Sequence, residues 1–254
     1  MFNIEEFDIK LDTEYIGRNF IYCDEVESTN SVLLTSKEFN QNGTVLLSEF
    51  QSQGRGRKNR EWISSSGQNL TFSILLKEDF KDRKMNLINL GSAVAIAQAI
   101  ENLCQLDVEL KWPNDVLVGK KKVAGILLES ISKGNKINKL VIGIGVNVNQ
   151  PNFPGKFDLP PTSLRKEFHL LISRERLLSE ILNNLENVLS DRGKGEKILS
   201  DWRARCKMIG EKVKIIEDDN IISGIFDDID ENGFLVLKQN NKKEKIHYGD
   251  VSLR

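Results

Sequence analysis

The spacing of apolar and polar residues predicts a protein built from β-strands and a few buried helices. Short β-prone runs indicate strands at 19–23, 44–50, 69–76, 116–118, 123–128 and 139–149. A long Ala-rich apolar stretch predicts a helix at 87–104 that packs against a sheet, and amphipathic spacing predicts helices at 174–189 and 196–205. A short helix should follow Ser28, Thr29 and Asn30, which are good N-cap residues. Capping alone would explain this triplet, and a role in ligand binding is the alternative that stays open.

The pattern changes after Cys206. Four short strands are predicted at 212–216, 221–227, 233–237 and 243–248, and Asp-, Asn- and Gly-rich turns separate them. We interpret this stretch as a small β-barrel. The predicted fold class is therefore α+β, with a mixed or antiparallel sheet packed with helices in a domain over 1–206 and a small barrel over 207–254.

A hairpin is predicted within KWPNDVLVGKKKVAGILLE, residues 111–129. Gly119-Lys120 fits a two-residue turn. In that register Lys122 lies opposite Leu117, and Asp115 is its diagonal neighbour on the same face, roughly 7–8 Å away. The hairpin would aim an ammonium and a carboxylate at one place. Gly125 inside an apolar strand indicates the close approach of a ligand or of backbone. The alternative is a solvated surface hairpin, on which Lys and Asp are common.

The segment from Gly54 to Trp62, GRGRKNREW, is the second distinctive feature. Its glycines free the backbone, and its arginines and lysine provide donors for phosphate oxygens. This predicts a cationic loop that an anionic ligand would order. The alternatives are a solvated loop or a contact with RNA. An RNA-binding module would present aromatic stacking platforms, yet aromatics make up 7% of the chain and only Trp62 lies beside the arginines.

Composition narrows the class of protein. The chain has 254 residues, 39% of them hydrophobic and 29% charged, with a net charge of −1, so it has no overall basic field for nucleic acid. Its three cysteines are far apart and fit free thiols in a reducing compartment. The acidic N-terminus does not resemble a signal peptide, and no run has the ~20 apolar residues of a membrane helix. We expect a cytoplasmic protein with no membrane partner.

Taken together, the two motifs resemble those of the biotin protein ligases (biotin–[acetyl-CoA-carboxylase] ligases). Lys-Trp-Pro-Asn-Asp followed by Lys-Val-Ala-Gly has the form and spacing of the central motif of that family, and the glycine–arginine run matches G-R-G-R-x-G-R-x-W. Asn59 stands where the family has its third Gly. Asn tolerates a positive φ better than other non-Gly residues, so we expect the turn to survive. The resemblance extends from about residue 20 to the C-terminus and implies the class II synthetase-like catalytic fold followed by an SH3-like barrel.

The resemblance also implies a site. Its biotin-binding residues would be Ser28, Thr29, Asn30, Gln51, Arg55, Gly56, Arg57, Lys122 and Gly125. Its ATP- and adenylate-binding residues would be Arg55, Arg57, Arg60, Trp62, Asn114, Lys122 and Asn147. Lys122, Arg57 and Asp115 are the catalytic candidates. Mg²⁺ would be held mainly by the ATP phosphates, with Asp115 as the candidate protein ligand.

The activity implied by the resemblance is the activation of biotin by ATP as biotinyl-5′-AMP, followed by transfer to a lysine of a biotin carboxyl carrier protein domain. Only 27 residues precede Ser28, too few for a helix-turn-helix domain, so we expect no DNA partner and no repressor function. The family has monomers and dimers, which leaves a homodimer open. A lipoate or octanoate transferase of related fold is the alternative enzyme, but its R-R-x-x-G-G-G run and H-x-D-like segment do not occur.

Overall fold

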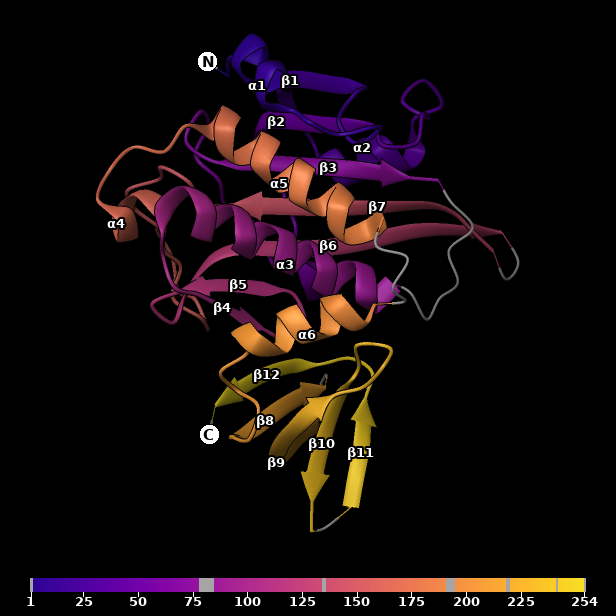
Figure 1. The fold of residues 1–254 in the computed structure, drawn as a ribbon, viewed down its shortest axis with the longest axis vertical. Helices are drawn as coiled ribbons and strands as arrows, with labels where there is room; N and C mark the ends of the chain where they lie inside the picture. Colours follow the sequence, from indigo (N-terminus) through magenta and orange to yellow (C-terminus); the bar gives the residue numbers. More distant parts are fainter. Residues whose placement is uncertain are drawn as a thin grey trace.

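The structure, a computed structural model, describes residues 2–77, 85–133, 136–190, 195–217, 220–240 and 242–253. These residues form a seven-stranded mixed sheet, in the order β1-β2-β3-β7-β6-β5-β4, and a five-stranded antiparallel sheet, in the order β11-β10-β9-β8-β12 (Figure 1). The larger sheet consists of β1 (Phe20–Val26), β2 (Val45–Gln51), β3 (Leu70–Leu76), β4 (Val108–Lys111), β5 (Asp115–Val118), β6 (Lys121–Lys133) and β7 (Lys136–Val146). The smaller one consists of β8 (Lys212–Glu217), β9 (Asn220–Ile229), β10 (Leu235–Gln239), β11 (Lys242–Ile246) and β12 (Asp250–Leu253).

Helices cover both faces of the large sheet. Those that the structure describes are α1 (Ile4–Lys10), α2 (Thr29–Thr35), α3 (Met85–Cys104), α4 (Leu164–Phe168), α5 (Arg174–Ser190) and α6 (Glu196–Arg205), with a short 3₁₀ turn at Arg57–Asn59. α3 packs against α5, α6 and the strands β4 to β6, whereas α2 packs against β2, β3, β6 and β7. In Figure 1, α5, α3 and α6 lie in front of the large sheet, and the small sheet lies below α6.

Alternation along the strands separates the core from a second, more polar face. In β7, Ile142, Ile144 and Val146 point into the main core. Val141 points the other way, into a small cluster under α2. Because side chains alternate along a strand, Gly143 and Gly145 share the face of Val141. The face under α2 therefore has open backbone where the other face has packed side chains.

The long helix α3 is apolar on most sides because it is surrounded by protein. By length and composition it could cross a membrane, but 67% of its most apolar 18-residue window is buried inside the molecule. That burial is the expected property of a core helix, as the Ala-rich stretch at 87–104 predicts. The three long helices begin and end within two residues of their predicted limits, and the α+β fold class is confirmed.

The predicted barrel is wrong. Closure would require the outermost strands of the small sheet to pair, but β11 and β12 lie at opposite ends of its order, with no pairing between them in the part of the chain that the structure describes. β11 carries Lys242, Lys243 and Lys245, and exposed lysines on an edge strand oppose further pairing. The sequence also failed to predict β4, β12, α1 and α4.

The central hairpin forms in the predicted register. Leu117 lies opposite Lys122, and Gly119 and Lys120 both have positive φ angles, 55° and 64°, as a type I′ turn requires. A bulge in β6 then shifts the pairing, so that Asp115 lies opposite Gly125. Lys122 shares the face of Leu117 and Asp115, and the bulge brings Gly125, in place of Ala124, onto that same face.

Candidate active site

A row of residues runs across the large sheet and forms the floor of the site. Thr71 pairs with Gly145, Gly145 with Gly125, Gly125 with Asp115, and Asp115 with Lys111. All five residues point to the face that carries α2, since their strand neighbours fill the core. The row therefore passes from a polar residue, over two glycines, to a carboxylate and an ammonium.

A cavity of about 920 Å³ lies over this row. The strands β3 to β7, the N-terminus of α2, the glycine–arginine loop and the proline-rich loop around Phe157 all contribute to its walls. Every site residue predicted from the sequence lines it, namely Ser28, Thr29, Asn30, Gln51, Arg55, Gly56, Arg57, Arg60, Trp62, Asn114, Asp115, Lys122, Gly125 and Asn147. Residues far apart in the sequence thus meet in one cavity.

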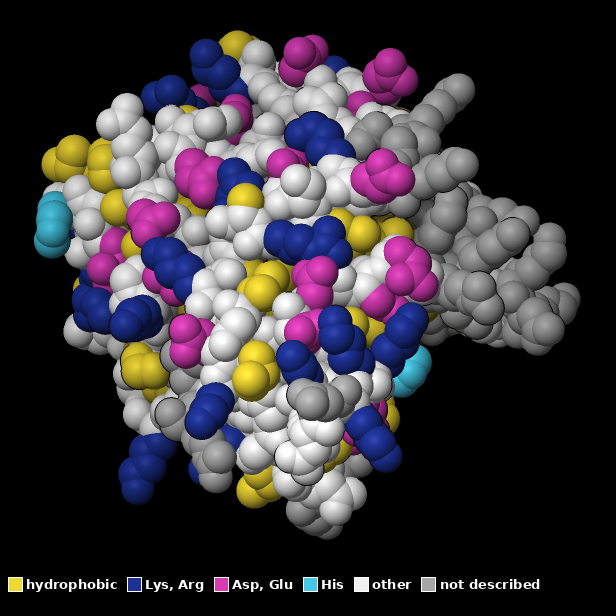
Figure 2. Space-filling model, turned by 60° about the horizontal axis from the view of Figure 1, so that its bottom comes forward, with side chains coloured by type: hydrophobic (Ala, Val, Ile, Leu, Met, Phe, Trp, Pro, Cys, Tyr) yellow, Lys and Arg dark blue, Asp and Glu magenta, His cyan; other side chains and the backbone are white. Residues whose placement is uncertain are grey.

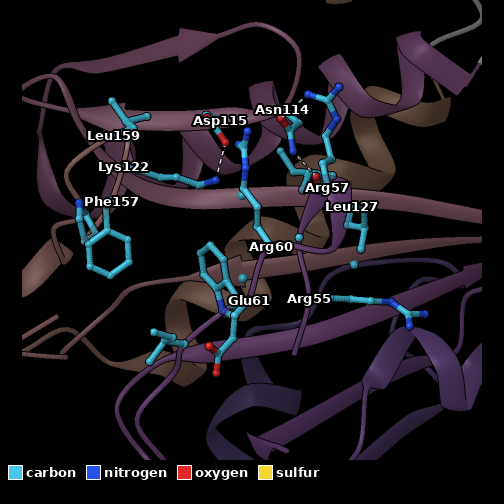
Figure 3. Close-up of a pocket in the computed structure, with 18 of the residues that line it drawn as sticks. Arg55, Arg57, Arg60, Glu61, Asn114, Asp115, Lys122, Leu127, Phe157 and Leu159 are labelled. Atoms are coloured by element: carbon cyan, nitrogen blue, oxygen red, sulfur yellow. Dashed lines mark hydrogen bonds and ion pairs between the residues drawn. The ribbon is translucent and has the colours of Figure 1, made fainter. Parts of the chain in front are cut away.

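Lys122 lies at the centre of the cavity and points at Asp115, as Figure 3 shows. Its Nζ is 2.6 Å from Asp115 Oδ1 and 5.6 Å from the ring centroid of Trp62. The backbone of Lys122 is fixed by the proline-rich loop, because its N–H donates to Pro160 and its carbonyl accepts from Thr162, both at 2.9 Å. The predicted convergence of this lysine and carboxylate is confirmed.

One end of the cavity is a network of neutral polar groups. Gln51 Oε1 accepts hydrogen bonds from the backbone N–H of Thr29, at 2.7 Å, and from its hydroxyl, at 2.9 Å. Ser73 Oγ lies 2.6 Å from both Thr29 Oγ1 and Asn30 Oδ1, and its single proton can serve only one of them at a time. Ser28 caps α2, since its side chain accepts from Ser31 N–H, and it also lines the cavity. Capping and a place in the site are therefore compatible.

The two glycines of β7 are required by this packing. A Cβ on Gly143 would lie 2.3 Å from Asn30 Oδ1, and a Cβ on Gly145 would lie 2.3 Å from Trp62 Cε2. At Gly125 a Cβ would lie 3.0 Å from Lys122 Nζ. The close approach at Gly125 was predicted from the sequence, but that at Gly143 and Gly145 was not, although a Gly inside a strand commonly marks such an approach.

The glycine–arginine loop folds back on itself. Gly56 N–H donates to Arg60 O at 2.7 Å, and Trp62 N–H donates to Gly54 O at 2.9 Å. Between these bonds Lys58 and Asn59 adopt left-handed backbone, with φ angles of 53° and 55°. The prediction that Asn59 can occupy the place of a glycine is confirmed, because Asn is one of the few residues that adopt this conformation readily.

Two arginines of the loop turn to a carboxylate of the small sheet. Arg57 Nη1 is 3.2 Å from Asp250 Oδ1, and Arg60 forms an ion pair with the other oxygen of Asp250. Arg57 also donates to Gly249 O at 3.1 Å. Burial lowers the pKa of Arg57, and the nearby carboxylates oppose this shift. Asp250 was not predicted as a site residue, because no local pattern at 250 indicates contact with a loop near 57.

Arg55 points away from Lys122 (Figure 3). Its Nη2 lies 3.1 Å from Glu129 Oε1 and donates to Ser31 Oγ at 3.1 Å. The other oxygen of Glu129 accepts from Asn30 Nδ2 at 2.7 Å. Glu129 thus joins the loop to α2, and the ligand contacts predicted for Arg55 stay a prediction.

Two buried polar atoms in the cavity wall have no hydrogen-bond partner. They are Trp62 Nε1, a donor, and Asn147 Oδ1, an acceptor. Buried polar groups are nearly always paired, so these atoms indicate a polar ligand with both donors and acceptors. No group of three or more His, Cys, Asp or Glu able to hold a metal occurs among the described residues. A divalent ion here would need the phosphates of a ligand beside a single carboxylate, which suits Mg²⁺.

Charge is dispersed outside the cavity. Figure 2 shows basic and acidic side chains interspersed over the face that it draws, with no large area of one sign. Nucleic-acid binding by backbone contacts depends on such a basic area. The face shown gives no support to the RNA-binding alternative.

Comparisons with known proteins are consistent with this geometry. The sequence model described as "Biotin/lipoate A/B protein ligase family" matches residues 22–147, and that of the "Biotin protein ligase C terminal domain" matches 208–254. The chain is 33% identical to the bifunctional ligase/repressor BirA of Bacillus subtilis, covering 96% of this chain and 76% of BirA. It is 31% identical to the biotin–[acetyl-CoA-carboxylase] ligase of Mycobacterium tuberculosis, covering 88% of this chain and 85% of that ligase.

Among solved structures, the fold is similar to the biotin protein ligase of Aquifex aeolicus in complex with biotin and ATP. The TM-score is 0.82 and the sequence identity 30%, and the match covers 93% of this chain and 99% of the Aquifex chain.

Proposed function

This chain belongs to the biotin protein ligase family and is a biotin ligase, and on that premise we propose how it works. It activates biotin with ATP as biotinyl-5′-AMP and then transfers the biotinyl group to one lysine of a biotin carboxyl carrier protein domain. The observation that carries the proposal is the Lys122–Asp115 pair, which lies under Trp62 at the centre of a cavity with a neutral polar end and a cationic end.

The cationic end suits the first step. A carboxylate oxygen of biotin attacks the α-phosphorus of ATP, and pyrophosphate leaves with the electron pair of the broken P–O bond. Two anions must approach each other, so fixed positive charge is required. Lys122 and Arg57 provide it, and such preorganised charge is the largest catalytic contribution in many enzymes. Asp115 keeps the ammonium of Lys122 in place.

The neutral polar end favours biotin over lipoate. The ureido ring of biotin has two N–H donors and one carbonyl acceptor, whereas the dithiolane ring of lipoate has neither. Asn30, Thr29 and Gln51 offer both donors and acceptors, and a site that pairs with such groups discriminates strongly against a ligand that lacks them.

Mg²⁺ fits the donor set described above, with ATP phosphates as its main ligands and Asp115 as its protein carboxylate. When bound, the ion neutralises phosphate charge. The protein's own residues hold biotin, orient its carboxylate and cover the anhydride: Trp62 and the glycine–arginine loop form that cover, which would limit hydrolysis before transfer.

Biotin-dependent exchange of labelled pyrophosphate into ATP tests this function. We expect exchange with biotin and Mg-ATP, little exchange with lipoate, and transfer of biotin to an apo carrier domain. Exchange with lipoate but not biotin would favour the alternative transferase. The absence of DNA binding and a cytoplasmic location stay predictions, and monomer and homodimer both stay open. A gel shift with duplex DNA in the presence of biotin and ATP tests the absence of DNA binding.

A further inference from the structure

Lys111 is a cation of the cavity to which the proposed function gives no role. It ends β4 and lies directly opposite Asp115 in the antiparallel pair. Its neighbours Val108 and Leu110 fill the core, so alternation places Lys111 on the face of the cavity, which it lines. It is half-buried.

Apart from Lys156, which is exposed, the other cationic groups that line the cavity have carboxylate partners. Lys122 is paired with Asp115, Arg55 with Glu129, and Arg57 and Arg60 with Asp250. No carboxylate lies within ion-pair distance of Lys111 in the part of the chain that the structure describes. Burial lowers its pKa, and Lys122 adds a like charge that acts in the same direction, while Asp115 and Asp250 oppose it. A half-buried ammonium without a partner is costly, and such groups are common where an anion binds.

The row of residues from Thr71 to Lys111 across the large sheet indicates where an anion bound by Lys111 would lie. The neutral polar network is next to β3 and β7, and Lys122 is on β6. Asp115 follows on β5 and Lys111 on β4, about 10 Å from β6 at the usual spacing of two strands. A ligand whose ring lies at the polar end and whose carboxylate reaches Lys122 would direct further phosphates toward β4.

We propose that Lys111 binds the β- and γ-phosphates of ATP and stabilises the leaving pyrophosphate. As a biotin carboxylate oxygen bonds to the α-phosphorus, the bond from that phosphorus to the α,β-bridging oxygen breaks, and its electron pair stays on pyrophosphate. The ammonium of Lys111 meets this growing negative charge, and no proton is transferred. The assignment rests on the proposed function, since it requires ATP as the substrate.

The other role open to Lys111 is structural. It could orient Asp115 across the strand pair and so position Lys122 without touching a phosphate. That role predicts equal loss of affinity for every ligand that reaches Lys122, with or without the β- and γ-phosphates. A role at the leaving group predicts loss only for ligands that carry these phosphates.

The test compares ligand binding by full-length Lys111→Gln, Lys111→Arg and the unchanged protein. Isothermal titration calorimetry measures pyrophosphate and a non-hydrolysable ATP analogue with Mg²⁺, and separately a non-reactive biotinyl-adenylate mimic that ends at the α-phosphate. We expect Lys111→Gln to lower the affinity for pyrophosphate and for the ATP analogue at least tenfold, and to change the affinity for the mimic by no more than about twofold. Lys111→Arg should restore most of the lost affinity. Lys121→Gln is the matched control, because Lys121 is exposed, pairs with Glu167 and does not line the cavity.

Equal weakening of all three ligands, or no weakening of pyrophosphate, would overturn the assignment. A melting temperature within a few degrees of that of the unchanged protein confirms that Lys111→Gln folds. If Lys111→Gln does not fold, the same titrations are made with Lys111→Arg, which keeps the charge. Failure of the proposed function has a different signature: the unchanged protein would then bind neither the mimic nor the ATP analogue and would show no biotin-dependent exchange.

Discussion

At three positions of this site the absence of a side chain matters as much as the functional groups do at others. Gly125, Gly143 and Gly145 have no side chains where Lys122, Asn30 and Trp62 must approach the sheet. Each glycine weakens its strand, because it has no side chain to pack, and that cost is accepted where another group needs the space. The sequence can show such a glycine but not its neighbour: the approach of Trp62 to Gly145 depends on a loop 83 positions earlier in the chain.

Adding one methyl group at Gly145 tests this packing. In Gly145→Ala the new carbon would overlap Trp62, so the ring must move from above Lys122. We expect the dissociation constant for biotin to rise at least about tenfold, equivalent to ~1.4 kcal/mol, in calorimetric titrations. An unchanged affinity in a variant with normal urea unfolding would contradict the role given to the ring.

The secondary-structure elements explain how much could be predicted. The hairpin of β5 and β6 was predicted with its turn and register because both are local: a Gly-first turn and alternating apolar residues fix them. The long helices were predicted for the same reason. The small sheet stays open because β12 pairs with β8, far earlier in the chain, and not with its sequence neighbour β11. No local pattern predicts that distant pairing, and the barrel prediction failed there. α1 and α4 are short helices whose stability comes from packing on the rest of the protein.

The helix α2, which presents Thr29 and Asn30, is held at its other end by a lysine from β7. Lys139 Nζ donates to the carbonyls of Leu33, Leu34 and Ser36, at 3.4, 3.2 and 2.8 Å. A cation at a helix C-terminus satisfies its free carbonyls and its dipole. We expect Lys139→Met to cost about 1–2 kcal/mol of unfolding free energy and to raise the KM for biotin several-fold, with the KM for ATP little changed. Equal changes in both KM values would argue against this link.

A buried ion pair joins β2 to α5. Arg174 binds both oxygens of Glu49, at 2.5 and 2.9 Å, and each side chain is less than a tenth exposed. Burial by itself would raise the pKa of Glu49, but hydrogen bonds from Arg174 and Tyr22 outweigh it, and the pKa is lowered. A carboxyl with a lowered pKa stabilises the fold above its unfolded pKa, and that contribution is lost as pH falls through the folded value.

Replacing this carboxylate should therefore have a pH-dependent effect. At about pH 7, Glu49→Gln should lose roughly 3–5 kcal/mol of unfolding free energy, because Arg174 is left buried without its charge partner. Urea unfolding at decreasing pH should show this difference from the unchanged protein narrowing below about pH 4.5. A difference that stays constant down to acid pH would contradict the lowered pKa.

Considered as a whole, the molecule brings its small sheet to the edge of the cavity. Ile216, Asp250, Val251 and Ser252 line the cavity together with residues of the large sheet. The small sheet is tied to the central motif, since Trp112 Nε1 donates to Gly233 O at 3.1 Å, and to α6 through Arg203 and Asp228, 2.7 Å apart. This geometry explains why the sequence of either part alone could not predict the complete site.

Limited proteolysis tests the contact of Asp250 with the glycine–arginine loop. Asp250→Asn removes the charge that holds Arg57 and Arg60. We expect trypsin to cleave the ligand-free variant after these residues at least about threefold faster than the unchanged protein, because local opening of a segment governs its cleavage. Asp201→Asn, which alters a surface pair with Lys197, is the matched control. Equal rates in all three proteins would show that Asp250 does not restrain the loop.

The most direct test of the whole account is native mass spectrometry of the protein after incubation with biotin and Mg-ATP. We expect the unchanged protein to retain a ligand of the mass of biotinyl-5′-AMP, and Lys122→Gln to bind biotin but form no adenylate. Retention of the adenylate by Lys122→Gln at the level of the unchanged protein, or its absence from the unchanged protein, would contradict the claim that this lysine joins the two anions.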